Sequence, residues 1–294
     1  MAPNKDRTVL VMGATGQQGG AVLKHLQEKN FTVRVLTRDP DKPEARALVG
    51  HGISVLQGDQ DDVASLERAM DGVDGVFSVQ NWTGGEEAEI RQGKNVVDAA
   101  NRQDVAHLVY SSVAAADRNT GIPHFDSKAR IEEHLQNSGL AYTVVRPAFF
   151  MENWLNFKQW IEGGTVALPL TPDKHLQMVA VDDIGAFVAR VFEHPRRWHG
   201  KTEELAGDDL PMSEIAARFS IIEGKEVKYQ QVPWDQFQQQ AGHELTIMFR
   251  WLQDHGYTVD VSALRQEFHD LTNFERWLNT QWREKTAESR GANA

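Results

Sequence analysis

The sequence predicts an α/β protein with a doubly wound parallel sheet, followed by a smaller, mostly helical C-terminal lobe. An apolar, β-branched run at 8–12 breaks directly into a glycine-rich turn. Strand-like and helix-like patterns then alternate through residue 146. From Pro147 onward the alternation loosens, and seven of the eight tryptophans lie after residue 150. Strands that alternate with helices indicate parallel pairing through helical crossovers.

The first strand–turn–helix unit carries a phosphate-binding signature. The strand 8–12 is followed by the turn 13–19, by a helix with Val22, Leu23 and Leu26 on one face, and by a second strand at 31–36. Glycines permit the tight turn, and the start of the helix offers free amides and a partial positive charge to a pyrophosphate. This context predicts a Rossmann dinucleotide site. The residues expected to bind the cofactor here are Gly13, Thr15, Gly16, Gln17, Gln18 and Gly19.

The end of the second strand predicts which dinucleotide is bound. NAD sites usually place an acidic residue there for the ribose 2′-hydroxyl, whereas this chain has Thr37 followed by Arg38. A guanidinium can hold a 2′-phosphate through two parallel hydrogen bonds, and Lys42 adds a second positive contact. The alternative is that Arg38 is a solvated loop charge beside Asp39. The pattern favours NADP(H) over NAD(H).

The other strand-like and helix-like patterns predict the rest of the sheet and the elements of the C-terminal lobe. Further strands are expected at 53–56, 73–79, 106–111 and 142–145, and helices around Leu66 and Met70, at 86–101 and at 125–137. The expected strand order is 3-2-1-4-5-6, with the ligand crevice at the C-terminal edges of strands 1 and 4. Beyond it, we expect a strand at 177–181 and helices at 182–193, 212–219, 233–240, 243–253 and 274–281, then a polar tail. We therefore predict an NADP-binding Rossmann domain over 1–150 and a smaller substrate or partner lobe over 151–294, some of whose strands and helices return to the main domain.

Polar residues follow the third and fourth strands of the predicted sheet. Asp59 and Gln60 lie in the loop expected near the adenine ring, where they could bond its edge; the alternative is a turn in which the acids Asp61 and Asp62 cap the next helix. Gln80 and Asn81 follow the fourth strand, on the far wall of the crevice, where such a loop passes the nicotinamide ribose. Trp82 either covers the site or packs its own loop.

Ser111 ends the fifth strand, and His124 and Lys128 begin the next helix, four residues apart and so on one helical face. This arrangement resembles the short-chain dehydrogenases, in which a Ser follows the fifth strand and a Tyr-x-x-x-Lys motif follows on the helix. Here Lys128 keeps the Lys position, but His124 stands at the Tyr position. An imidazole titrates near pH 6.5 and can move protons, so His124 and Lys128 are the catalytic candidates.

With that departure, the chain resembles the NmrA-like branch of the atypical short-chain dehydrogenases and is similar to the human-type NmrA-like NADPH-sensor proteins. The resemblance covers nearly the whole chain and is carried by 13–20, 57–62, 91–94, 124–128 and 152–153. It implies NADP(H) binding through the glycine-rich turn together with Arg38, Lys42, Asp59, Gln60, Gln80, Asn81, Lys128, and the segment from Phe150 to Asn153. It also implies weak or absent dehydrogenase activity in many members, while others reduce quinones or dyes.

The composition of the chain limits the kinds of chemistry and of binding partner that are expected. The chain of 294 residues has no cysteine and a net charge of −11, which excludes thiolate chemistry and argues against direct nucleic-acid binding. No apolar run approaches the roughly 18 residues of a membrane span. The N-terminus lacks a signal-peptide core, and no histidine shows metal-ligand spacing. A cytoplasmic location, or a nuclear one as well, fits these features.

Two functions fit the predicted site. The favoured hypothesis is a regulator that binds NADP(H) and signals its redox state to a protein partner, because the cofactor site is complete but lacks the proton-donating Tyr. The alternative is an NADPH-dependent reductase of a quinone or similar electron-poor compound, whose protons can come from water. A homodimer is compatible with either hypothesis.

Overall fold

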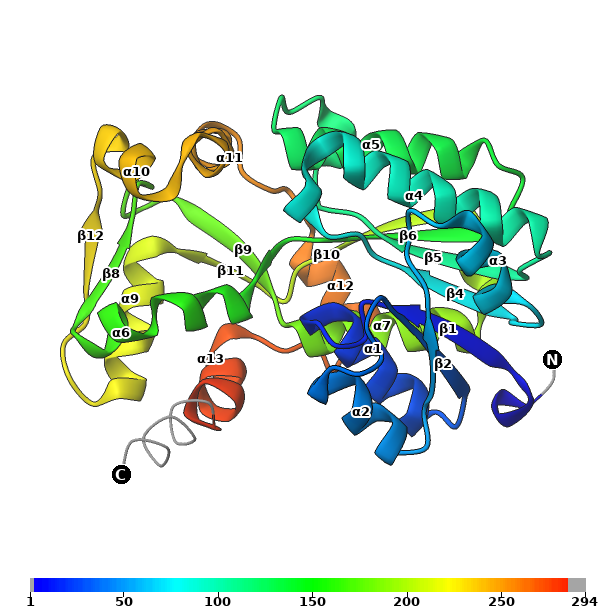
Figure 1. The fold of residues 1–294 in the computed structure, drawn as a ribbon. Helices are drawn as coiled ribbons and strands as arrows, with labels where there is room; N and C mark the ends of the chain where they lie inside the picture. Colours follow the sequence, from blue (N-terminus) through cyan, green and yellow to red (C-terminus); the bar gives the residue numbers. More distant parts are fainter. Residues whose placement is uncertain (1–2, 285–294) are drawn as a thin grey trace. The chain divides into compact units, whose positions relative to one another are not determined.

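The computed structural model describes residues 3–284. Its residue contacts divide the described chain into two compact units (Figure 1). Unit 1 contains residues 3–146 and 184–204, and unit 2 contains residues 147–183 and 205–284. The expected polar tail falls mostly in 285–294, which lie outside the described residues.

Unit 1 is built on a seven-stranded sheet with the order β10-β6-β5-β4-β1-β2-β3. The strands are β1 (Thr8–Met12), β2 (Thr32–Thr37), β3 (Ser54–Gln57), β4 (Gly75–Ser78), β5 (His107–Ser111), β6 (Tyr142–Pro147) and β10 (Lys201–Leu205). From β3 to β6, every neighbouring pair is parallel, as in Val9 opposite Val33. The predicted order 3-2-1-4-5-6 is confirmed, and β10 extends the sheet beyond β6.

Helices cover both faces of this sheet, as a doubly wound fold requires. They are η1 (Asn4–Asp6), α1 (Gln17–Glu28), α2 (Pro43–Gly50), α3 (Val63–Met70), η2 (Trp82–Gly84), α4 (Gly85–Arg102), η3 (Ala116–Arg118), α5 (Pro123–Gln136), α7 (Val181–Glu193) and α8 (Pro195–Trp198). In Figure 1, α1, α2 and α7 lie on one side of the sheet, and α3, α4 and α5 on the other. The helix α2 was not predicted from the sequence, although it begins at Pro43, a residue suited to the first helical position.

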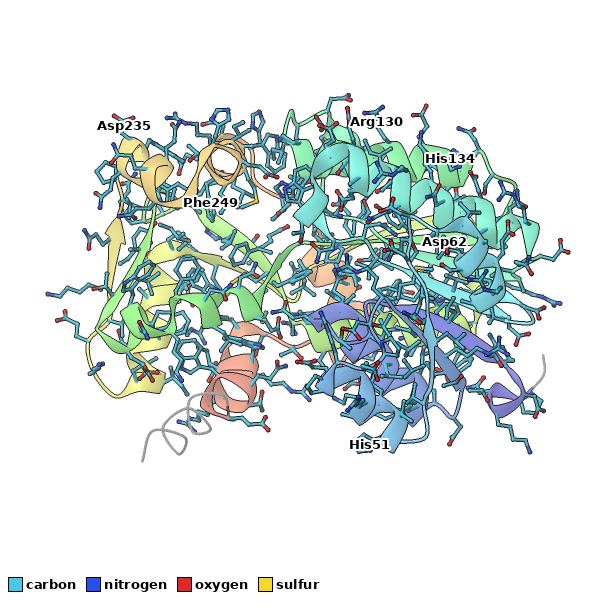
Figure 2. The ribbon with its side chains drawn as sticks, viewed as in Figure 1. His51, Asp62, Arg130, His134, Asp235 and Phe249 are labelled. Carbon is cyan, nitrogen blue, oxygen red and sulfur yellow. The ribbon has the colours of Figure 1, made fainter. Side chains whose placement is uncertain are left out.

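The sheet is buried on both faces, so its strands are almost continuously apolar rather than alternating. On the side of α3, α4 and α5, Leu10, Val76 and Leu108 of the sheet pack with Leu66 of α3 and Val97 of α4. Side chains on the outer faces of these helices reach the surface (Figure 2), as does His134 of α5, whose ring nitrogen lies 2.7 Å from an Asp98 carboxylate oxygen. The crossover helices therefore hold the strand ends, and the loops after them, in fixed positions.

Unit 2 combines two small sheets with helices. Its strands are β7 (Phe149–Phe150), β8 (Thr165–Leu168), β9 (His175–Val179), β11 (Asp208–Pro211) and β12 (Lys228–Gln231), in the orders β11-β9-β7 and β12-β8. Its helices are η4 (Met151–Phe157), α6 (Lys158–Glu162), α9 (Met212–Glu223), α10 (Trp234–Ala241), α11 (His243–Asp254), α12 (Val261–Glu267), α13 (Phe274–Trp277) and the π-helical turn η5 (Leu278–Trp282). The strand expected at 177–181 is β9, which ends earlier because Val181 already begins α7. The helix expected at 274–281 is divided between α13 and η5.

Large rings and buried carboxylates hold the C-terminal part of unit 2. Trp154, Trp277 and Trp282 are all buried, as expected for tryptophans that fill a small core. The Trp277 indole N–H donates to the Glu152 carboxylate at 3.0 Å. Burial raises the pKa of Glu152, although its hydrogen bonds from the backbone and from Trp277 oppose the rise. This contact fixes α13 against η4 within the unit.

Candidate functional site

The glycine-rich turn after β1 has the geometry of a phosphate cradle. Gly13 has φ +64°, a conformation that favours glycine, and the Gly16 N–H donates to the Gly13 carbonyl at 2.8 Å. A Cβ on Gly19 would lie 2.6 Å from the Met12 carbonyl oxygen and nearer still to that of Gly13. Thr15, Gly16 and Gln17 are exposed at the start of α1. The first N–H groups of a helix have no intrahelical partner, so this exposed helix start can receive an anion.

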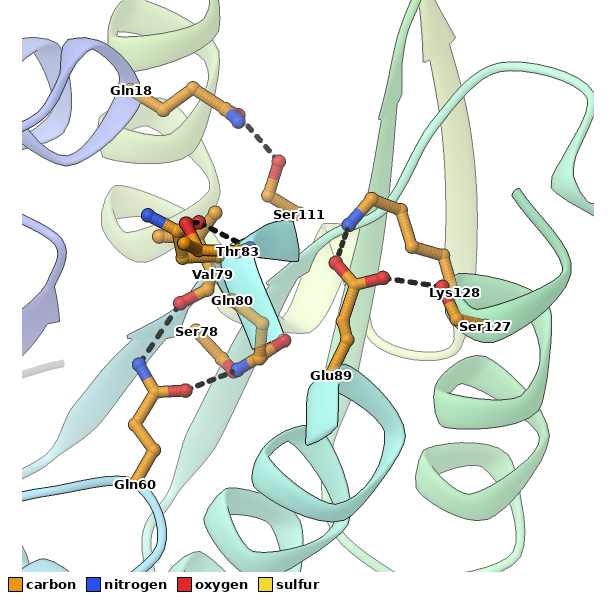
Figure 3. A network of polar contacts seen from close by, with 11 residues as sticks. Gln18, Gln60, Ser78, Val79, Gln80, Thr83, Glu89, Ser111, Ser127 and Lys128 are labelled. Carbon is orange, nitrogen blue, oxygen red and sulfur yellow. Dashed lines mark hydrogen bonds and ion pairs between the residues drawn. The ribbon is translucent and has the colours of Figure 1, made fainter. Parts of the chain in front are cut away.

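A hydrogen bond links this turn to the end of β5. The Ser111 hydroxyl donates to Gln18 Oε1 at 2.5 Å (Figure 3). The sequence placed Gln18 in the phosphate turn and Ser111 at the end of the fifth strand. The structure brings them together across β1 and β4. The side-chain oxygen of Gln18 therefore already accepts a hydrogen bond from within the protein.

The end of β2 carries exposed charged side chains of both signs, with Asp39 and Asp41 between Arg38 and Lys42. Arg38 directly follows β2, and Lys42 precedes α2; both are exposed. Nearby, the Asp61 carboxylate accepts from Arg91 at 2.8 Å and from Gln92 at 2.9 Å. These two hydrogen bonds, with a smaller contribution from the charge of Arg38, lower the pKa of Asp61. Arg38 thus stands where a 2′-phosphate would be expected.

Two glutamines connect the loops after β3 and β4. Gln60 donates to the Val79 carbonyl at 3.1 Å, and Gln80 donates to Gln60 Oε1 at 3.1 Å and to the Ser78 hydroxyl at 3.0 Å (Figure 3). Gln80 is 8% exposed, and its Oε1 has no hydrogen-bond partner within residues 3–284. A buried acceptor without a partner is costly unless something else donates to it.

Asp59 and Asn81 stabilise their own turns. Asp59 Oδ1 accepts from the Asp61 N–H at 3.0 Å, and Asn81 Oδ1 accepts from the Thr83 N–H at 2.8 Å. Asp62 caps α3 through its side chain. The alternative that acids of this loop cap the next helix is therefore confirmed for Asp62. A contact of Asp59 or Asn81 with the nucleotide stays a prediction.

The structure places His124 and Lys128 one turn apart near the start of α5, as expected from their spacing. Lys128 forms an ion pair with Glu89 of α4, whose other carboxylate oxygen accepts from the Ser127 hydroxyl (Figure 3). The His124 ring makes edge contacts with Trp82 and with Phe125, at centroid distances of 5.6 and 4.9 Å. Trp82 thus packs against the helix that carries both catalytic candidates.

Phe150 and Asn153 lie in unit 2, in β7 and η4, and both are half-buried. Their assignment to the nucleotide stays a prediction. Within residues 3–284, no cluster of three or more His, Asp or Glu side chains could hold a metal ion. No helix of that part of the chain is long and apolar enough to cross a membrane.

Sequence reasoning missed Glu89. It lies in an acidic stretch with Glu86 and Glu87, which is typical of a solvated helix start. However, Glu89 precedes Gly93 by four positions and Val96 by seven, and this spacing places it on the buried face of α4. This periodicity is the feature of the sequence from which the burial of Glu89 could have been predicted.

The fold and the cradle define a Rossmann-type dinucleotide-binding protein. Residues 5–278 match the NmrA-like family model, and the chain belongs to this family. Quinone oxidoreductase 2 of Escherichia coli is 30% identical over 224 residues, covering 76% of this chain and 77% of that protein.

Two solved structures share the fold. One is an NADPH-dependent quinone oxidoreductase of Escherichia coli in complex with NADPH, with a TM-score of 0.81, 27% identity, and 93% and 99% coverage of the two chains. The other is NmrA, a negative transcriptional regulator in complex with NADP. Its TM-score is 0.77 at 21% identity, with 93% and 94% coverage. At that identity, the likeness to NmrA concerns the fold alone.

Proposed function

We propose that this chain binds NADP(H) at the C-terminal edge of β1, β2 and β4. The observation that carries the proposal is the exposed, glycine-rich start of α1, with the exposed Arg38 side chain at the end of the neighbouring strand. The pyrophosphate would be held by the turn 13–19 and the 2′-phosphate by Arg38, with Lys42 adding positive charge. The complex of the Escherichia coli relative with NADPH supports this assignment.

Arg38→Ala is expected to weaken NADPH binding by about 1.5–3 kcal/mol for each charge-assisted hydrogen bond lost, while NADH affinity barely changes. Calorimetric titration with both nucleotides measures the difference. Arg46→Ala is the matched control, because Arg46 is exposed on α2 and pairs with Asp41. Equal losses for NADPH and NADH would refute the 2′-phosphate assignment.

We further propose that the chain is an oxidoreductase that reduces a quinone or a similar electron-poor acceptor. A bound reduced nicotinamide supplies a hydride, and one proton from water completes reduction of a quinone to a hydroquinone. The chain's own residues then do not need to donate a proton. Lys128 and Ser111 orient the bound nucleotide, while His124 and Trp82 shield one end of the crevice. The missing Tyr matters little for such an acceptor, and the name of the Escherichia coli relative supports this function.

The second candidate is a redox sensor that reports bound NADP(H) to a protein partner, as a monomer or a homodimer. It is favoured by one observation: a histidine packed against two rings stands where dehydrogenases have a phenol. A nucleotide can shift such a protein only through different affinities for two conformations.

Incubation with NADPH and a panel of quinones separates the two functions when absorbance of the reduced nicotinamide is followed. We expect turnover of about 1 per second or faster, the range of ordinary enzymes. Saturable NADPH binding without turnover on any quinone would favour the sensor. If the well-folded protein binds neither NADPH nor NADP⁺, both proposed functions are refuted.

A further inference from the structure

A fully buried carboxylate lies beside the lysine of the candidate site. Glu89 is 0% exposed, and Figure 3 shows its carboxylate between the Lys128 ammonium and the Ser127 hydroxyl. The Lys128 side chain is 15% exposed, so its stem is covered while the residue still reaches the surface.

The packing of two helices builds this contact. Gly93 of α4 faces Ile131 of α5, where an added Cβ would lie 2.5 Å from the Ile131 Cδ1 atom. Glu89 and Ser127 each precede that crossing by four residues, which is about one helical turn. The close approach at Gly93 therefore brings Glu89 onto Ser127 and Lys128.

The pair lies on the nicotinamide side of the proposed site. Glu89 lies in the second turn of α4, which follows β4 and η2, and Lys128 lies in the second turn of α5, which follows β5 and η3. Arg38 marks the opposite, adenosine side, at the end of β2. A dinucleotide across a Rossmann sheet extends from the β2 side to the β4 side.

The two redox forms of the nucleotide differ in charge where this pair lies. The oxidised nicotinamide ring carries a positive charge that the reduced ring lacks. An unpaired ammonium nearby would repel the oxidised form selectively, and a neighbouring carboxylate cancels most of that repulsion.

We propose that Glu89 is a specificity-determining residue: by neutralising Lys128, it allows the site to hold the oxidised nucleotide as well as the reduced one. The inference rests on the proposed binding of NADP(H) and deepens it. It applies to a sensor, which must compare the two forms, and equally to a reductase, which must hold one and release the other.

The test is the ratio of the dissociation constants for NADP⁺ and NADPH, measured by calorimetry on wild type and variants. Glu89→Gln keeps the shape and the acceptor oxygen but removes the charge. We expect it to weaken NADP⁺ about tenfold relative to NADPH, which corresponds to about 1.4 kcal/mol. Lys128→Met removes the opposite charge and should shift the ratio the other way, even if both affinities fall. The double variant should return to the wild-type ratio.

Ser127→Ala is the matched control, because it removes a hydrogen bond to Glu89 without changing any charge. Its ratio should stay within about twofold of wild type, whereas loss of packing alone would change both affinities together. If wild type binds both forms and Glu89→Gln leaves the ratio unchanged, the inference is wrong while the proposed function stands. If wild type binds neither form, the proposed function itself fails. If Glu89→Gln does not fold, Lys128→Met provides the test: a ratio that does not shift in favour of NADP⁺ would overturn the inference.

Discussion

Replacing Gly19 by alanine is expected to reduce NADP(H) affinity by at least about 100-fold, or about 2.7 kcal/mol. The new Cβ would meet backbone atoms of Met12 and Gly13 rather than a side chain that can rotate away. The start of α1 must then move off β1, and the amides that form the cradle move with it. Overpacking of this kind also lowers the free energy of unfolding by about 1–3 kcal/mol.

Gly20→Ala is the matched control on the same helix turn. A Cβ there would lie 3.3 Å from the Ala14 carbonyl oxygen, so a shift of a few tenths of an ångström accommodates it. Calorimetric titration with NADPH and urea unfolding of both variants provide the comparison. Similar affinities for the two variants would show that the close approach at Gly19 does not shape the cradle.

The sequence was sufficient to predict the Rossmann sheet and its glycine turn because these features are local. The run 8–12 and the glycines after it can be recognised without knowing what packs on them. The strand order then follows from general rules of crossover handedness and connection, and the structure confirms it. Arg38 could be singled out for the same reason, since its meaning depends only on its place after β2.

The parts that escaped prediction depend on partners distant in the chain. Glu89 resembles a surface acid until α5 supplies Ser127 and Lys128, which lie 38 and 39 residues away. The short strands β8 and β12 pair across about 60 residues of sequence, and neither has enough residues to show a period of two. Gln18 fits a phosphate turn by its position, and only the folded sheet shows its bond to Ser111.

A buried ion pair gives the largest expected effect on stability. Arg146, at the end of β6, donates to both oxygens of Glu132 on α5, at 3.0 and 2.6 Å, and pairs with Asp117 at 2.8 Å. Burial alone would lower the pKa of Arg146, but its bonds to Glu132 and Asp117 outweigh this and raise it. The guanidinium therefore stays charged and anchors the segment between β5 and α5.

Arg146→Met is expected to lower the free energy of unfolding by about 3–5 kcal/mol, because it leaves the Glu132 carboxylate buried without its counter-charge. Arg102→Met removes the exposed partner of Glu67 and should cost less than about 1 kcal/mol. Urea unfolding followed by circular dichroism measures both. Adding Glu132→Leu to Arg146→Met should recover more than half of the loss, since the uncompensated charge is then gone. Additive losses in the double variant would mean that Arg146 stabilises the unit by packing, and that the stranded carboxylate is not the cause.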